Sequence, residues 1–155
     1  MPLKTLTRIK DLRVERAERQ NQQARGCVQV AKLNCEQGQA DYQRYRLWRK
    51  SEETRLFEQC QAQPLNRRQL EQWQQQVASL REQEAALEQH LIELDQALAH
   101  EREQLKSASQ RLVKAQYQVE KFRQFNQQAM AEEKFLLELK EEQELTEFRR
   151  QEAPL

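Results

Sequence analysis

The sequence contains few of the residues that interrupt regular structure, with two glycines and three prolines in 155 residues. It is also poor in aromatic residues (6%) and in apolar residues generally (37%), whereas 33% of its residues are charged. A two-layer domain needs more apolar surface than this, so we exclude a broad hydrophobic core. Such a composition is typical of a disordered chain or of long solvated helices, and only the periodicity of the apolar residues separates the two.

Long apolar runs are absent as well. No stretch approaches the ~20 residues that a membrane-spanning helix needs. The opening residues, MPLKTLTRIK, lack the apolar central region of a secretory signal. We therefore predict a cytoplasmic protein that does not insert into a membrane.

The patterns of a catalytic or metal site are missing too. There is no glycine-rich phosphate loop and no serine in a nucleophile elbow. Cys27, Cys35 and Cys60 have no metal-ligand spacing, and His90 and His100 lie far from them in the sequence. We predict no enzyme activity, no cofactor and no bound metal.

Charge is balanced over the whole chain but not along it. The net charge of +1 argues against a general nucleic-acid binder. Residues 1–32 carry eight Lys and Arg against three acidic residues, whereas residues 132–152 carry eight Glu against four basic residues. Because acidic residues interleave with the basic ones and few aromatics lie nearby, we favour a solvated helix face or docking on an acidic protein over nucleic-acid binding.

What the sequence does contain is a heptad repeat in its second half. Numbered in sevens from Leu70, the first and fourth positions are apolar at sixteen of twenty sites over ten heptads, which predicts a coiled coil. The first positions are Leu70, Val77, Glu84, Leu91, Leu98, Leu105, Leu112, Val119, Asn126 and Glu133. The fourth positions are Trp73, Leu80, Leu87, Leu94, Glu101, Ala108, Ala115, Phe122, Ala129 and Leu136.

A weaker repeat runs through the first half. Small residues at several of its first positions would let a second helix approach closely, and Gly26 and Gly38 each cost roughly 1 kcal/mol in a helix. The first positions are Leu3, Lys10, Ala17, Ala24, Ala31, Gly38, Tyr45 and Glu52. The partner positions are expected near Leu6, Arg13, Cys27, Asn34, Trp48 and Arg55 or Leu56.

A turn near residues 61–66 is expected to separate the two halves. Pro64 cannot continue a helix without losing a backbone hydrogen bond, and Asn66 followed by Gln69 resembles a capping box. A short connection forces neighbouring helices to run in opposite directions. The predicted fold is therefore all-α: an elongated, antiparallel two-helix coiled-coil hairpin that is a monomer when isolated.

The predicted hairpin is one domain over residues 1–155 with arms of unequal length. Helix one covers about residues 3–60 and helix two about residues 67–152, so residues from about 125 onward have no intramolecular partner. Apolar residues in this overhang no longer keep the heptad phase, and they indicate either a frayed tail or a segment that buries them in another protein. These residues are Phe135, Leu136, Leu137, Leu139, Leu145 and Phe148.

The aromatic residues are concentrated near the turn. Tyr42, Tyr45, Trp48, Phe57 and Trp73 make up half of all the aromatic residues of the chain. They could act as a splint for the end of the hairpin. Two thin helices cannot hide five large rings, however, and Trp and Tyr are enriched at binding hot spots. We therefore expect part of this cluster to be a docking patch.

Four strings carry a resemblance to a known family: LRVERAER at residues 12–19, YRLWRKSEETRLFEQ at 45–59, LEQWQQQVASLREQE at 70–84 and VEKF at 119–122. Together they resemble the YscO (SctO) family of type III secretion proteins, the injectisome counterparts of the flagellar FliJ protein. The resemblance implies a non-enzymatic central stalk that links the hexameric secretion ATPase to the cytoplasmic domain of the export gate at the inner membrane. It also implies contact with secretion chaperones.

The resemblance further implies which ends of the hairpin meet which partner. The gate contact of the flagellar relative aligns with Tyr42, Tyr45, Trp73 and Val77, to which the aromatic cluster adds Trp48. The ATPase is expected to contact the terminal ends of both helices. The residues expected there are Arg8, Arg13, Arg16, Arg19, Phe135, Leu139 and Phe148.

Two other classes of protein remain open at this stage. A generic coiled-coil spacer would form a homodimer with twice the mass and would lose helicity on dilution. A chaperone of exported proteins would bind its clients through residues 135–148, so that deleting residues 132–155 would abolish client binding and leave ATPase binding unchanged.

Overall fold

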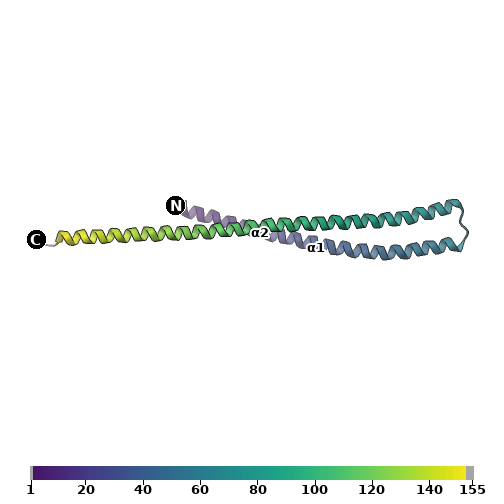
Figure 1. Cartoon of the computed structure of the whole chain (residues 1–155), viewed down its shortest axis with the longest axis horizontal. Helices are drawn as coiled ribbons and strands as arrows, with labels where there is room; N and C mark the ends of the chain where they lie inside the picture. The colour runs from purple at the N-terminus through teal and green to yellow at the C-terminus, as the bar shows by residue number, and fades with distance from the viewer. Residues whose placement is uncertain (1, 153–155) are drawn as a thin grey trace. The chain divides into compact units, whose positions relative to one another are not determined.

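The computed structural model describes residues 2–152, which form two long α-helices. Helix α1 spans Pro2–Ala62 (61 residues) and helix α2 spans Arg67–Glu152 (86 residues). Figure 1 shows the short connection that joins them, and the described residues contain no strand. The helical hairpin with a longer second helix confirms the fold class that the heptads predicted.

The turn occupies residues 63–66 and is closed by the predicted capping box. The backbone N–H of Gln69 donates to Asn66 Oδ1 (2.8 Å), and the backbone N–H of Asn66 donates to Gln69 Oε1 (3.2 Å). The first helical hydrogen bond of α2 follows directly, from Leu70 N to Asn66 O at 3.1 Å. Two backbone donors that a helix start leaves without partners are thus satisfied reciprocally, which fixes where α2 begins.

The chain divides into two compact units, each built from a segment of α1 and a segment of α2. The tip unit comprises residues 21–108 and contains the turn. The terminal unit comprises residues 1–20 and 109–155. Each unit is described by itself below.

In α2 the buried face follows the predicted heptads closely. Every first and fourth position from Trp73 to Asn126 is buried or half-buried, and Ser109 is the one further described residue of α2 that is not exposed. The heptad positions after Asn126 are no longer buried: Ala129, Glu133 and Leu136 are exposed. Leu70, next to the turn, is also exposed (44%).

In α1 the predicted first positions from Lys10 to Glu52 are buried or half-buried, as expected, whereas the predicted partner positions other than Leu56 are exposed. Leu3 and Leu6 are 46% and 44% exposed. The buried face recurs at spacings of three and four through those first positions and through Val14, Asn21, Val28, Cys35, Tyr42, Arg49 and Leu56. The predicted Arg13, Cys27, Asn34, Trp48 and Arg55 are all exposed.

This error has a physical reason. Several buried positions of α1 hold polar residues, such as Asn21, Cys35 and Arg49, and these are tolerated because the facing segment of α2 supplies polar partners. Cys35 Sγ, for example, donates to the Leu94 carbonyl oxygen at 3.4 Å. The weak repeat therefore identified the first positions of α1 and missed most of the partner positions.

The core is a narrow seam of small side chains. The buried apolar residues are Ala17, Ala31, Leu56 and Ala108, and no large side chain of the described residues is fully buried. The accessible surface is 13259 Å². A globular protein of the same mass would expose about 8,300 Å². Most of this surface is therefore free to contact partners.

The two helices of the tip unit approach each other closely at Gly38. A Cβ atom at this position would lie 2.6 Å from Leu94 Cδ1 and 3.2 Å from Leu91 Cδ2, whereas a Cβ at Gly26 would meet nothing within 4 Å. The prediction that a small residue at position 38 allows close packing is thus confirmed, and Gly26 has no such role.

The two glycines form a matched pair for a stability test. We expect Gly26→Ala to raise the free energy of unfolding by about 1 kcal/mol, because alanine favours the helix and meets open space. We expect the free energy of unfolding of the Gly38→Ala variant to be at least about 1 kcal/mol lower than that of the Gly26→Ala variant, since the added methyl group displaces the two leucines. Urea unfolding measures both. Equal stabilisation by the two substitutions would contradict the close approach at Gly38.

Candidate docking surfaces

An ionic cluster crosses the seam of the tip unit. Arg49 Nε lies 2.6 Å from Glu84 Oε2, and Arg49 Nη1 lies 3.0 Å from Glu53 Oε2. Arg81 Nε approaches Glu53 Oε1 at 3.1 Å, and Arg46 Nε approaches Glu84 Oε1 at 3.8 Å. Two carboxylates thus bind three guanidinium groups drawn from both helices.

The cluster explains why a glutamate occupies an apolar heptad position. The side chains of Arg49 and Glu84 are only 12% and 17% exposed. Because a poorly solvated charge is costly without a partner of opposite charge, each side chain stabilises the other. Burial raises the pKa of the Glu53 carboxyl, but hydrogen bonds from Arg81 and Arg49 outweigh it and hold the pKa below its ordinary value. The cluster therefore fixes the register of the two helices near the turn.

Tyr45 is tied into the same seam. Its hydroxyl donates a hydrogen bond to the Leu80 carbonyl oxygen at 2.8 Å. Burial and the neighbouring Glu84 carboxylate raise the pKa of this hydroxyl. The Tyr45 ring also contacts Trp48, with ring centroids 5.6 Å apart and planes tilted by 44°. Tyr45 is thus a structural residue whose ring packs against Trp48.

The structure divides the aromatic cluster into two groups. Tyr42, Tyr45 and Trp73 are half-buried in the seam, as is Val77. Trp48 and Phe57 are 51% and 50% exposed. The first group packs inside the hairpin, as the splint interpretation expects. The second group is exposed and available to a partner.

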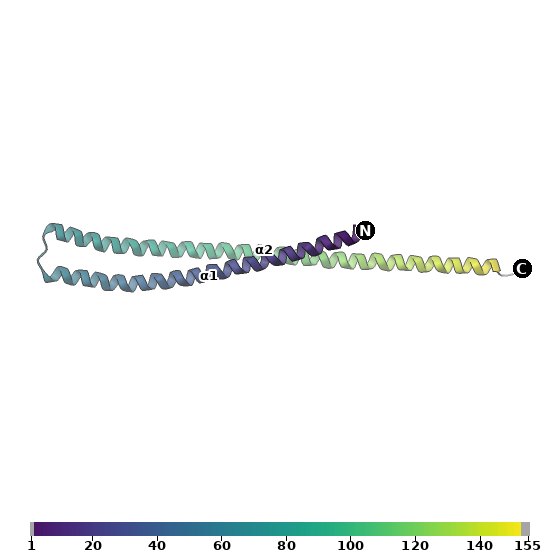
Figure 2. The same cartoon turned by 180° about the vertical axis from the view of Figure 1, so that it is seen from behind.

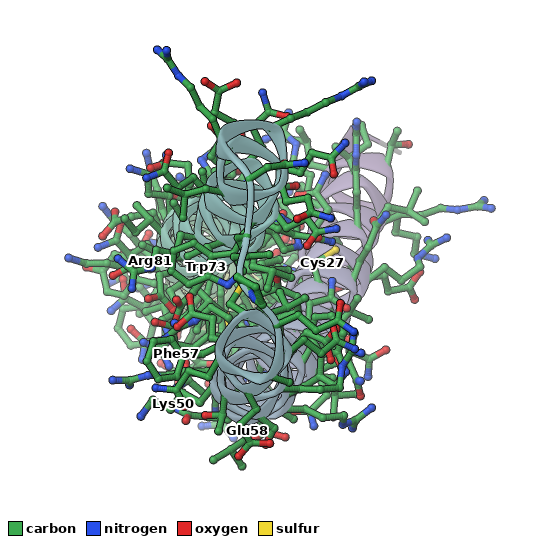
Figure 3. All side chains as sticks on the ribbon, turned by 90° about the vertical axis from the view of Figure 1, so that its right-hand side faces the viewer. Cys27, Lys50, Phe57, Glu58, Trp73 and Arg81 are labelled. Carbon is green, nitrogen blue, oxygen red and sulfur yellow. The ribbon has the colours of Figure 1, made fainter. Side chains whose placement is uncertain are left out.

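A groove of about 420 Å³ runs along one flank of the tip unit. Figure 3 shows Lys50, Phe57 and Arg81 on this flank, with Trp73 between the two helices. Trp73 Nε1 is buried and has no hydrogen-bond partner among the described residues. The groove is lined by Lys50, Glu53, Thr54, Phe57, Trp73, Val77 and Arg81.

Sequence reasoning missed the polar side of this groove. Lys50, Thr54 and Arg81 carry no signal of their own, because exposed polar residues are ordinary on a solvated helix. Their convergence depends on which residues of α2 face α1, and the predicted partner position Trp48 lies one residue before the half-buried Arg49. With the register correct, Glu53 and Arg81 could have been expected to meet.

The terminal unit presents a basic and aromatic surface. The Lys10 ammonium lies 5.3 Å from the centroid of the Phe122 ring, a cation–π contact between α1 and α2. Beside it is a groove of about 430 Å³ lined by Lys10, Arg13, Gln118, Lys121, Phe122 and Phe125. The predicted Arg8, Arg13, Arg16 and Arg19 are all exposed.

Beyond Asn126, helix α2 continues without a partner. Every described residue from 127 to 152 is exposed, and we call this segment the overhang. Figure 2 shows the C-terminal end of α2 continuing past the N-terminal end of α1. The predicted Phe135, Leu139 and Phe148 are 61%, 41% and 56% exposed. The overhang thus keeps large apolar side chains in solvent over 26 residues.

The structure provides no evidence of a chemical centre. No group of three or more His, Cys, Asp and Glu in residues 2–152 could hold a metal ion. The three cysteines are free, and burial raises the pKa of the Cys35 thiol. No helix in the described part of the chain is long and apolar enough to cross a membrane.

Comparison with known proteins defines the class to which this hairpin belongs. A family model described as "Type III secretion protein YscO" matches residues 3–151. The chain is therefore a type III secretion protein, and it belongs to the YscO family.

Two relatives support this membership. The chain is 42% identical over 120 residues to the "Yop proteins translocation protein O" of Yersinia pseudotuberculosis serotype I (strain IP32953), a match that covers 77% of this chain and 78% of the relative. A crystal structure of the type III secretion protein YscO from Vibrio parahaemolyticus matches with a TM-score of 0.88 at 33% identity. That match covers 94% of this chain and 92% of the Vibrio chain. Family and fold thus agree.

Proposed function

We propose that this chain is a non-enzymatic central stalk that couples the hexameric ATPase of a type III secretion system to the cytoplasmic domain of its export gate. In this role it promotes assembly or activity of the ATPase, and it works as a single hairpin domain. It acts in the cytoplasm at the inner-membrane base of the secretion apparatus. The name of the Yersinia relative refers to the translocation of Yop proteins, and membership of the same family supports a role in protein export for this chain.

The observation that carries the proposal is the exposed overhang of α2. Most helical stability in proteins comes from packing an apolar face, and the overhang packs against no other described segment. Phe135, Leu139 and Phe148 have no cover within the described chain. A protein that encloses the overhang would bury these side chains, and a ring of ATPase subunits is a partner of that kind.

The basic face of the terminal unit supports the same assignment. The exposed Arg8, Arg13, Arg16 and Arg19 recur along one segment of α1, beside the groove that Phe122 and Phe125 line. Arginine binds carboxylates through paired hydrogen bonds, so this face suits an acidic protein surface. We assign both features to the ATPase contact.

At the other unit we assign the gate contact to the aromatic residues near the turn. Trp48 is the residue of the predicted set that offers the most surface, since Tyr42, Tyr45, Trp73 and Val77 lie in the seam. Tyr45 and the seam residues hold Trp48 in place and contribute their exposed edges. Coupling then requires that both ends bind their partners at the same time.

The coupling role is tested by assembling all three proteins. We expect sedimentation of the purified ATPase, this chain and the gate's cytoplasmic domain to yield a ternary complex that neither partner forms with the other alone. Trp48→Ala should weaken gate binding by roughly tenfold, a loss typical of a hot-spot tryptophan, and leave ATPase binding unchanged.

Tyr45→Phe is the matched control, because it removes only a seam hydrogen bond worth about 1 kcal/mol. It should lower the free energy of unfolding and leave gate affinity within about twofold, since the exposed Trp48 ring stays. Gate binding that survives Trp48→Ala would remove the aromatic tip from the proposal, and failure of any ternary complex would remove the coupling role.

A further inference from the structure

The groove on the flank of the tip unit combines an apolar floor with a basic rim. Phe57, Trp73 and Val77 supply its apolar surface. Lys50 and Arg81 also line it, and the Arg81 side chain is 67% exposed. A ligand side chain placed here would meet an aromatic surface and two cations together.

The charges at this groove are not balanced within the chain. Glu53 is the one carboxylate in the lining, and both of its oxygens are occupied, one by Arg81 at 3.1 Å and the other by Arg49 at 3.0 Å. Lys50 makes no ion pair with any described residue. Among the residues that line the groove, Lys50 and Arg81 stand against the single carboxylate of Glu53. The groove is therefore positively charged.

The ring of Trp73 gives the groove an aromatic surface next to its basic residues. Its Nε1–H is buried without a hydrogen-bond acceptor in the described chain, although the residue lines the groove. An unsatisfied buried donor carries a penalty of about 1–3 kcal/mol.

We propose that the groove binds a partner segment that carries an apolar side chain next to a carboxylate, in other words an acidic peptide. The apolar side chain packs on Phe57, Trp73 and Val77, and the carboxylate pairs with Lys50 and Arg81. This deepens the gate contact of the proposed function and rests on it for the identity of the partner, but the peptide chemistry stands on the groove alone.

The inference also distinguishes two sides of α1. Trp48 and Phe57 are nine residues apart, which is about two and a half helical turns, so they project from opposite sides of the helix. Trp48 therefore lies outside the groove, and its surface is a separate contact. A segment bound in the groove should leave the surroundings of the Trp48 indole unchanged.

Nuclear magnetic resonance of the isotope-labelled full chain tests this directly, because Trp48 and Trp73 are its two indole signals. The probe is a short synthetic peptide in which Asp and Glu alternate with Leu and Phe. We expect it to shift the Trp73 indole N–H signal in a saturable way, because Trp73 lines the groove, and to leave the Trp48 signal in place. A matched peptide with Asn and Gln in place of the acids should bind at least about tenfold more weakly.

Substitutions assign the site. Lys50→Glu should weaken peptide binding by about tenfold, and raised salt should weaken it further. Arg44→Glu makes the same change in net charge at an exposed residue that does not line the groove, and it should have little effect. Phe57→Ala should reduce affinity and leave the helical content unchanged.

Each outcome decides the matter. An unmoved Trp73 signal, equal shifts of both indoles, or equal binding of the two peptides would overturn the acidic-peptide site. Peptide binding without any ternary complex of ATPase, chain and gate would support the groove and reject the proposed coupling function. A ternary complex that forms normally with Lys50→Glu would show that the gate does not use this groove.

Discussion

Replacing Arg49 with leucine is expected to lower the free energy of unfolding by about 2–3 kcal/mol, one of the largest losses that a single side chain of this hairpin can cause. Arg49 is only 12% exposed and pairs with both Glu53 and Glu84, so its removal leaves two poorly solvated carboxylates facing the seam. Urea unfolding monitored by circular dichroism measures the change.

Arg46→Leu provides the control, because Arg46 also approaches Glu84 but is 47% exposed and 3.8 Å away. It should cost less than about 1 kcal/mol, as exposed ion pairs do. The double variant Arg49→Leu, Glu84→Leu should recover part of the stability, since an apolar pair of similar size fits the seam. Equal effects at Arg46 and Arg49 would mean that the cluster is a surface feature without a role in register.

Acid should weaken the same cluster. The pKa of Glu53 is held below its ordinary value, so its contribution is present above that value and is lost as the pH falls through the lowered pKa. Glu53→Gln should therefore flatten the acid limb of the stability curve, and an unchanged acid limb would contradict the pairing of Glu53 with two arginines.

The second large effect is expected at the other unit. Changing Arg13, Arg16 and Arg19 together to glutamate should raise the concentration needed for half-maximal ATPase stimulation by at least about tenfold, because each reversal puts like charges against an acidic partner. All three side chains are exposed, so helicity and the free energy of unfolding should remain nearly unchanged. The hydrolysis rate as a function of chain concentration measures the effect.

Changing Arg67 and Arg68 to glutamate gives a matched control, since both residues are exposed and lie in the first turn of α2, far along the chain from the terminal unit. This pair should leave stimulation intact. If both variants stimulate normally, the basic face of α1 has no part in the ATPase contact.

How much of this the sequence could predict depends on the kind of residue that fills each seam. Along α2, leucine and valine recur at heptad positions, and apolar periodicity located every seam residue from Trp73 to Asn126. Asn66 and Gln69 located the turn through their capping chemistry. Along α1 the seam holds alanine, asparagine, cysteine and arginine, so periodicity pointed to Arg13 and Trp48 where the structure uses Val14 and Arg49.

Some features of the candidate sites could likewise be predicted from the sequence, and others could not. The exposure of Arg8, Arg13, Phe135 and Phe148 could be expected, because these residues lie off the repeat or beyond its end. The groove at Lys50, Phe57 and Arg81 could not be expected, since it depends on the register between two helices. The burial of Trp73 Nε1 is a property of packing that no pattern in the sequence encodes.

The most direct measurement is the hydrolysis rate of the purified type III secretion ATPase from the same genome, with this chain added over a range of concentrations. The stalk account predicts saturable stimulation, or tighter assembly of the hexamer, and predicts that deleting residues 132–155, which removes most of the overhang, abolishes it. An unchanged rate with a demonstrably assembled and active hexamer would contradict the account.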